Sequence, residues 1–247
     1  MGMERLHGRV VIVTGSARGL GRDYARFFAA DGAHVVLADV KGTDGAAEEA
    51  SAAGPRCIGV ETDVTSRSST QALVERAVAE FGRLDVLVNN AGLWRGLHEA
   101  GLLNCPDELW DAAWSVNVTG SLRCYQAAVP AMAESGGGRV INVSSVASRS
   151  GAHAYGLTKN AVEHMTAGMA HEVGHLGITV NCIAPGISAF EAAGSRLSDA
   201  ERILADLAVP RVGTSRELYE AMAYLCSETA AWVTGQTLRV DGGAGLG

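Results

Sequence analysis

The chain has 247 residues, of which 47% are hydrophobic and 19% charged, and its formal net charge is −7 at pH 7. This length suits one globular domain with a sizeable core, and the negative charge disfavours nucleic acid or an anionic membrane surface as a partner. Five cysteines without a Cys-x-x-Cys pair fit neither a disulfide framework nor a zinc site, and no apolar run approaches membrane-spanning length. We therefore expect a cytoplasmic protein with reduced thiols.

Short β-branched runs alternate with helical patterns along the chain. The first run, Arg9–Thr14, is almost continuously apolar up to a glycine-rich turn, as in a strand buried on both faces. Further strands are expected at 33–39, 57–62, 84–89, 139–144, 178–183 and 236–240. Because strands that alternate with helices of ten or more residues indicate parallel β-α-β units, the sequence predicts an α/β fold. We expect a single domain over residues 1–247, with a doubly wound parallel sheet of about seven strands and helices on both faces.

The first turn, Thr14–Gly21, has the setting of a dinucleotide-binding loop, because it joins a strand to a helix. Gly15 would permit the tight turn, Gly19 would let a pyrophosphate approach the backbone, and Gly21 would let the helix pack closely on the strand. The glycine spacing differs from the commoner G-x-G-x-x-G, and turn glycines can be purely structural. Arg18 could meet the extra phosphate of NADP, or it could be a solvated arginine beside the pyrophosphate.

A carboxylate follows at the end of the second expected strand. Asp39 stands 24 positions after Gly15, near where an acidic residue meets the adenosine ribose hydroxyls, although it could instead cap a helix. A 2′-phosphate would be repelled there, so the sequence predicts NAD rather than NADP as the cofactor. Arg18 and Lys41 could offset part of that repulsion.

Tyr155 and Lys159 carry the chemistry that we expect. On a helix the two side chains are neighbours, and a cation held a few Å from a phenol lowers its pKa, so the tyrosine becomes a usable acid or base. Ser145, at the end of the preceding strand, could hydrogen-bond the same substrate oxygen. This set suits alcohol and carbonyl chemistry, although a Tyr-x-x-x-Lys pair alone is more often an exposed surface pair.

These motifs together resemble the classical short-chain dehydrogenase/reductase family, over almost the whole chain. The matching segments are Thr14–Gly21, Asp63-Val64, Asn89–Gly92, Asn117, Ser145 with Tyr155 and Lys159, Pro185-Gly186, and Val240–Gly243. The resemblance implies a Rossmann-type fold and a catalytic set of Asn117, Ser145, Tyr155 and Lys159. It implies that the cofactor is bound by Gly15, Ser16, Arg18, Gly19, Leu20, Gly21, Asp39, Asp63, Val64, Asn90, Ala91, Gly92, Tyr155, Lys159, Pro185, Gly186 and Ser188.

The chain departs from the family pattern at two places. Ser145 precedes Tyr155 by ten positions, whereas about thirteen are usual, so the loop between them is shortened and Ser144 remains an alternative to Ser145. After Pro185-Gly186 the family usually has a threonine that touches the cofactor. Phe190 stands in that place, and Ser188 is the nearby hydroxyl.

The resemblance implies an NAD-dependent oxidoreductase that moves hydride between the cofactor and a secondary alcohol or its ketone. Two alternatives remain open: an NADPH-dependent ketone or 3-oxoacyl-carrier reductase, and a non-catalytic scaffold that binds nucleotide. Candidate substrate walls are Leu93, Trp94, Arg95, His153 and a lid at about 187–210. A homotetramer or homodimer is expected, through the long helix at about Asp107–Glu134 and the helix from Tyr155.

No metal site is expected. His171-Glu172-Val173-Gly174-His175 spells the H-E-x-x-H pattern of zinc proteases, which requires both histidines on one face of an unbroken helix. Gly174 and Gly177 mark a helix end instead.

Overall fold

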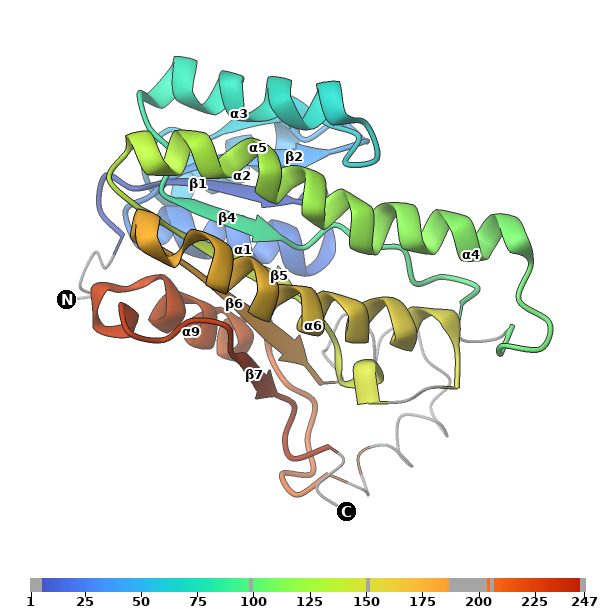
Figure 1. The fold of residues 1–247 in the computed structure, drawn as a ribbon. Helices are drawn as coiled ribbons and strands as arrows, with labels where there is room; N and C mark the ends of the chain where they lie inside the picture. The colour runs from blue at the N-terminus through green and yellow to red at the C-terminus, as the bar shows by residue number, and fades with distance from the viewer. Residues whose placement is uncertain (1–5, 98–99, 150–151, 187–203, 205–206, 245–247) are drawn as a thin grey trace.

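Seven parallel strands form one sheet, in the order β3-β2-β1-β4-β5-β6-β7, within the residues that the structure describes (Figure 1). The structure is a computed structural model and describes residues 6–97, 100–149, 152–186, 204 and 207–244. The strands are β1 (Val10–Thr14), β2 (His34–Asp39), β3 (Ile58–Glu61), β4 (Val86–Asn89), β5 (Gly138–Val143), β6 (Ile178–Pro185) and β7 (Thr237–Val240).

The main helices are α1 (Gly19–Ala30), α2 (Asp44–Ala53), α3 (Arg67–Phe81), α4 (Asp107–Trp114), α5 (Ser121–Glu134), α6 (Ala154–Val173) and α9 (Ser215–Cys226). A π-helical segment η1 (Ser115–Gly120) joins α4 to α5, and short 3-10 helices are η2 (Val146–Arg149), η3 (Gly174–Leu176) and η4 (Glu228–Ala230). All seven expected strands are present. β6 runs two residues further than expected because Pro185 still pairs with Val240 of β7.

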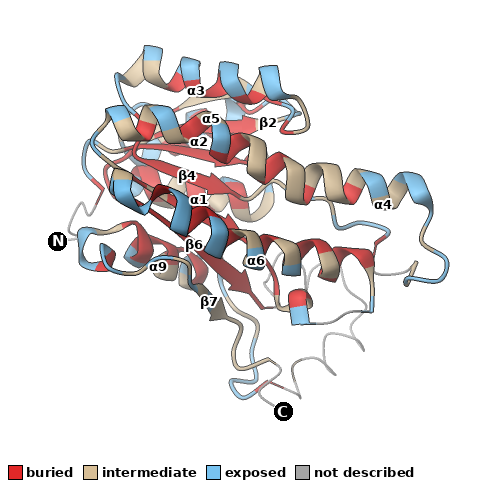
Figure 2. Cartoon of the chain, viewed as in Figure 1, coloured by how far each residue is buried: buried red, intermediate tan, exposed pale blue. Residues whose placement is uncertain are grey.

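Helices cover both faces of the sheet, as the hydrophobic pattern predicts. In β1, Val11 and Val13 belong to a core cluster with α1, α2 and α9, whereas Val10 and Ile12 belong to one with α3, α5 and α6. Successive side chains of a strand point to opposite faces, so a strand that is apolar throughout must be covered twice. Figure 2 shows this as buried strands between helices whose outer faces are exposed.

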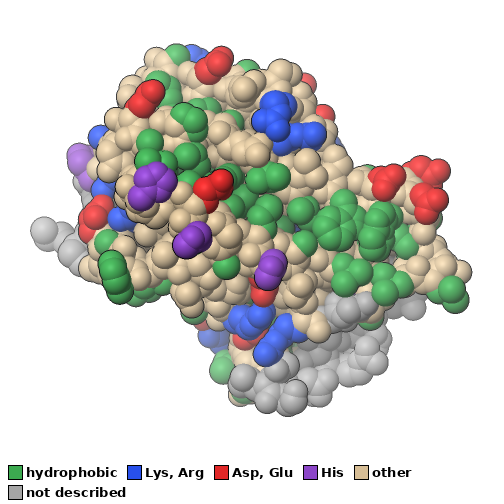
Figure 3. All heavy atoms as spheres, viewed as in Figure 1, with side chains coloured by type: hydrophobic (Ala, Val, Ile, Leu, Met, Phe, Trp, Pro, Cys, Tyr) green, Lys and Arg blue, Asp and Glu red, His purple; other side chains and the backbone are tan. Residues whose placement is uncertain are grey.

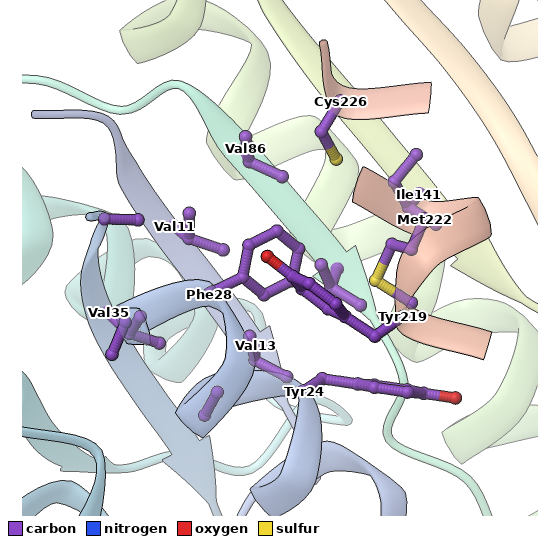
Figure 4. Close-up of a cluster of buried hydrophobic side chains, with 14 of the residues drawn as sticks. Val11, Val13, Tyr24, Phe28, Val35, Val86, Ile141, Tyr219, Met222 and Cys226 are labelled. Carbon is purple, nitrogen blue, oxygen red and sulfur yellow. The ribbon is translucent and has the colours of Figure 1, made fainter. Parts of the chain in front are cut away.

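Aromatic side chains fill the layer between the sheet and the α1 and α9 helices (Figure 4). Tyr219 of α9 packs edge-on against Phe28 of α1, with ring centroids 5.0 Å apart, and its hydroxyl donates to Asp31 at 2.8 Å. The buried phenol therefore has a partner, as a polar group in a core requires. This contact joins α1, which follows the glycine turn, to α9, which precedes the last strand.

The order of the strands reverses between β1 and β4. The chain goes outward from β1 to β2 and β3, and then crosses back to β4 on the other side of β1. Ligands in open α/β sheets bind at the carboxyl ends of the strands where the order reverses. The glycine turn after β1 and the Asn89–Gly92 segment after β4 both lie at this point.

All five cysteines lie in the described part of the chain, and all are free thiols. Burial raises the pKa of Cys124, Cys182 and Cys226 to about 12, so these thiols are poorly reactive. Among the described residues, no helix has both the length and the apolar character that a membrane crossing needs.

Candidate active site

A cavity of about 350 Å³ opens at the carboxyl ends of β1, β2, β4 and β5. Its lining includes these predicted residues: Gly15, Arg18, Gly19, Leu20, Gly21, Asp39, Asp63, Val64, Asn90, Ala91, Gly92, Ser145, Tyr155, Lys159 and Pro185. Segments that are far apart in the sequence thus meet around one cavity. Ser16 lies outside this lining, because it is fully buried and its hydroxyl donates to the Val13 carbonyl at 2.8 Å.

The glycine turn is held by the segment after β4. The Thr14 hydroxyl accepts hydrogen bonds from the amides of Asn90 and Ala91, each at 3.1 Å, and the Asn90 side chain donates to the carbonyls of Thr14 and Gly15. A Cβ at Gly15 would lie 2.7 Å from the Ala91 backbone. The two segments are therefore packed closely, and there is no room for a side chain at Gly15.

The start of α1 suits a phosphate. Arg18 at the N-cap is extended, and its side chain makes no capping hydrogen bond to the first amides of this 12-residue helix. Uncapped helix N-termini attract anions, both through free N–H groups and through the helix dipole. Gly19, Leu20 and Gly21 carry those amides and line the cavity. The residues present therefore fit a dinucleotide pyrophosphate.

Asp39 ends β2 at the rim of the same cavity. Its carboxylate accepts from the backbone amides of Ala17 and Lys41, each at 3.1 Å. Asp39 therefore braces the glycine turn as well as facing the cavity, which sequence reasoning did not foresee. Asp63 follows β3, the next strand outward, and accepts from the amide and hydroxyl of Thr65 at 2.8 and 2.7 Å.

Tyr155 and Lys159 lie one turn apart on α6 and are 8% and 4% exposed. The Lys159 ammonium is 5.7 Å from the centre of the Tyr155 ring and donates to the Val143 carbonyl at 2.6 Å. A Cβ at Gly92 would lie 3.5 Å from both Lys159 Nζ and Asn117 Oδ1. The lysine and the asparagine therefore face the same space beside Gly92.

The two candidate serines have different surroundings. The Ser144 hydroxyl lies 2.8 Å from a carboxylate oxygen of Glu163 and 3.1 Å from the Lys159 carbonyl, which are both acceptors for its proton. Ser145 Oγ accepts from the Ala147 amide at 3.2 Å, and both serines line the cavity. A hydroxyl that accepts from the backbone keeps its proton for another partner. This geometry favours Ser145 as the group that contacts a substrate.

Asn117 lies in the π-helical segment η1 rather than in a regular helix. Its side chain accepts from the Leu93 amide at 2.7 Å, and it donates to the Leu93 carbonyl at 3.0 Å and to the Thr158 hydroxyl at 2.9 Å. Asn117 thus joins the segment after Gly92 to α6. π-turns often occur at functional sites, because they shift a side chain out of helical register. The sequence predicted one continuous helix and gave no sign of this turn.

The predicted substrate walls are partly present. Leu93 and Trp94 line the cavity, and the Arg95 guanidinium lies 5.6 Å from the centre of the Trp94 ring. His153 instead caps α6, where its Nδ1 accepts from the Gly156 amide at 3.1 Å, and burial lowers its pKa. Its ring stacks near that of Tyr155, with centroids 6.3 Å apart.

Gly186 packs against Asp241, and its amide donates to the Val240 carbonyl at 3.0 Å. Ser188, Phe190 and nearly all of the predicted lid at 187–210 lie outside the described residues.

Known proteins share this arrangement over the whole chain. A family model described as enoyl-(acyl carrier protein) reductase matches residues 15–245. A cis-4-hydroxycyclohexanecarboxylate dehydrogenase of Sinomonas cyclohexanicum is 37% identical, over 97% of this chain and 98% of the relative. The 3-oxoacyl-[acyl-carrier-protein] reductase FabG of Escherichia coli is 35% identical, over 96% and 97%. The crystal structure of a putative short-chain alcohol dehydrogenase from Sinorhizobium meliloti superposes with a TM-score of 0.91, at 30% identity and 98% coverage of both chains.

The chain belongs to the short-chain dehydrogenase/reductase family. The fold and the family expected from the sequence are thus confirmed. As a member of this family the chain is an oxidoreductase related to enzymes that use nicotinamide cofactors.

The H-E-x-x-H segment lies at the end of α6. α6 ends at Val173, so His171 and His175 do not share a continuous helix, as Gly174 and Gly177 predicted. Sequence analysis overlooked Glu163, four residues after Lys159, although helical spacing alone puts it on the face of Tyr155 and Lys159.

Proposed function

We propose that this family member is an NAD-dependent oxidoreductase that transfers hydride between the nicotinamide and a secondary alcohol or its ketone. One observation carries the proposal: Tyr155, Lys159 and Ser145 line the same cavity as the uncapped start of α1. Proton-handling groups and a phosphate-binding turn around one cavity are what such a reaction needs. A cytoplasmic location is part of the proposal and is supported by the five free thiols.

Each side chain has a defined task in this proposal. Tyr155 removes the hydroxyl proton during oxidation and returns it during reduction, while Lys159 favours the phenolate. Ser145 donates to the substrate oxygen and orients it. The bound nicotinamide supplies the chemistry of accepting or giving the hydride.

The hydrogen bonds of Asn117 limit how its side chain could hold a water. Both amide hydrogens of its side chain are used by Leu93 and Thr158, so a water on this side chain must donate to Oδ1. That oxygen faces the space beside Gly92 that Lys159 Nζ also faces. A water there would carry the proton outward from Lys159.

The deciding experiment removes the proton and keeps the ring. Tyr155→Phe is expected to leave less than a few per cent of the wild-type rate of cofactor reduction with secondary alcohols, with unchanged cofactor binding. Tyr125→Phe is the matched control, because Tyr125 is a similarly buried tyrosine, 4% exposed, whose hydroxyl donates to Glu172 at 3.0 Å. A Tyr155→Phe variant as active as the control would remove Tyr155 from the reaction.

A second candidate is an NADPH-dependent ketone or 3-oxoacyl-carrier reductase. Arg18 and Lys41 line the cavity beside Asp39 and could receive a 2′-phosphate, and the similarity to the E. coli reductase points the same way. Comparing kcat/KM for the two cofactors separates the candidates. A third candidate, a scaffold that binds nucleotide without turnover, requires tight cofactor binding with no activity on a panel of alcohols and ketones.

We also propose a homotetramer or homodimer. Val116, Leu122, Ala127 and Val129 are only partly buried on the face of η1 and α5, and Figure 3 shows hydrophobic side chains gathered on this side of the molecule. A second copy would cover them. Light scattering that finds only a 25.6 kDa species would exclude this assembly.

A further inference from the structure

Glu163 lies behind the proposed catalytic residues, on the same helix. It follows Lys159 by four positions and Tyr155 by eight on α6, and its side chain is 13% exposed. Its Oε1 accepts from Ser148 Oγ at 2.5 Å and lies 2.8 Å from Ser144 Oγ. Its Oε2 accepts from Arg239 Nη2 at 3.0 Å. One largely buried carboxylate thus joins α6, the end of β5, η2 and β7.

The two serines that contact Glu163 stand on either side of Ser145. Ser145 is held between them by short-range bonds, since its Oγ accepts from the Ala147 amide and its carbonyl accepts from the Ser148 amide at 3.0 Å. Asn160 of α6 also donates to the Ser148 carbonyl at 3.3 Å. The position of Ser145 relative to Tyr155 therefore depends on the hydrogen bonds that hold this turn against α6.

The hydrogen bonds between this turn and α6 matter because the connection from Ser145 to Tyr155 is short. Only nine residues separate Ser145 from Tyr155. The turn after β5 therefore has few residues of its own that could hold it in place. Charge-assisted hydrogen bonds to a carboxylate are roughly twice as strong as neutral ones, and Glu163 makes them to both ends of the turn. Arg239 compensates the buried charge, which would otherwise be costly.

We propose that Glu163 is a positioning residue for the reaction: it holds the Ser144–Ser148 turn, and thereby Ser145, against α6. The proposal rests on the function proposed above, but its structural half can be measured without turnover. Glutamine at position 163 keeps the size of the side chain and one acceptor oxygen. Its NH₂ group, however, would face the hydroxyl or guanidinium donors that now bind the carboxylate. Aspartate keeps the charge and shortens the reach by one carbon.

Glu163→Gln is expected to lower kcat at least tenfold, with KM for the cofactor changed less than threefold, because the partners of Glu163 named above do not include the Thr14–Gly21 turn. Ser148→Ala, which removes one contact and no charge, is expected to lower kcat about threefold. Glu163→Asp should recover part of the loss. Glu80→Gln is the matched control, since Glu80 of α3 is 11% exposed and pairs with Arg56 and Arg76, which are not among the partners of Glu163.

Hydrogen exchange provides the readout that does not need activity. Faster exchange of the Ala147 and Ser148 amides is expected in Glu163→Gln and Ser148→Ala, and not in Glu80→Gln. Unchanged protection of these amides would overturn the proposal, as would faster exchange accompanied by wild-type kcat. If the wild-type chain turns over no alcohol or ketone, the proposed function fails, and hydrogen exchange still decides whether Glu163 holds the turn.

Discussion

Lys159 Nζ lies 2.6 Å from the Val143 carbonyl oxygen, so the ammonium that faces Tyr155 is also anchored to the end of β5. Lys159→Met keeps an unbranched side chain that is one atom shorter, and it removes both the charge and this bond. We expect kcat to fall at least ~100-fold, the scale of lost acid–base catalysis, and the remaining activity to require higher pH. A pH profile of kcat checks this; a Met variant with the wild-type profile would show that Tyr155 works without the lysine.

Gly92 controls the space between Lys159 and Asn117. A methyl group there would lie 3.5 Å from Lys159 Nζ and from Asn117 Oδ1, an ordinary contact distance, so Gly92→Ala should fold. The methyl would displace water from between the two polar atoms. We expect kcat to fall about tenfold, with the melting temperature changed by less than a few degrees. Wild-type kcat in this variant would argue against a water at that place.

Gly21 is required by packing at the cofactor turn. A Cβ there would lie 2.3 Å from the Gly15 carbonyl oxygen and 2.5 Å from Asn90 Nδ2, so the turn must shift. We expect Gly21→Ala to lower the free energy of unfolding by about 1–3 kcal/mol and to weaken cofactor binding at least tenfold. Gly45→Ala on α2 is the control, because nothing lies within 4 Å of its Cβ. Urea unfolding and fluorescence titration with NAD test both variants.

The sequence predicted the fold because its strands are apolar on both faces. Arg9–Thr14, for example, could only be a fully covered strand, and the ordered motifs then located the cavity. Contacts between distant segments could not be predicted in the same way. Arg239 and Glu163 stand 76 positions apart, and only the pairing of β7 with β6 brings them together.

Roles that depend on hydrogen-bond geometry were also beyond the sequence. The motif placed Asn117 at the site, but the binding of its amide to Leu93 depends on the π-turn. Likewise, the neighbouring residues do not reveal that Asp39 holds the Ala17 amide. Residue type and spacing therefore indicated which side chains lie at the site, while the partner of each hydrogen bond required coordinates.

Asp85 lies at the opposite end of the sheet from the cavity, and its carboxyl makes the stability of the fold depend on pH. Burial of this 1%-exposed carboxyl raises its pKa, but hydrogen bonds from Arg83, the Val10 amide and Arg9 outweigh burial, and the net pKa is lowered. Because the folded pKa lies below the unfolded value of about 3.9, the stabilisation is fully present above that pH and is lost as pH falls through the folded pKa.

Asp85→Asn should therefore lower the free energy of unfolding by about 2–4 kcal/mol at pH 7. The difference from wild type should shrink below about pH 4, where the Asp85 carboxyl of the unfolded chain begins to protonate, and should vanish as pH falls through the lower folded pKa. Urea unfolding at several pH values measures this. Glu48→Gln, at an exposed position, is the control and should change little. A difference that stays constant down to pH 2 would contradict the assignment.

The last prediction concerns the choice of cofactor. A 2′-phosphate near the Asp39 carboxylate would cost on the order of several kcal/mol before relaxation, even at an effective dielectric constant near 20. Arg18 and Lys41 line the same cavity and can offset only part of this. We therefore expect at least a tenfold advantage of NAD over NADP in kcat/KM, which corresponds to about 1.4 kcal/mol.

Asp39→Ser should shrink or reverse that advantage, because it removes the charge at the ribose. It also removes the acceptor of the Ala17 and Lys41 amides. An equal loss of activity with NAD and with NADP would therefore show only that the glycine turn is disturbed. Asp39→Asn separates the two effects, since its amide oxygen can still accept from one amide while the charge is gone. The NAD-to-NADP ratio should fall in both variants. Equal or better turnover of the wild-type enzyme with NADP would overturn the assignment, and the 3-oxoacyl-carrier reductase would become the leading candidate.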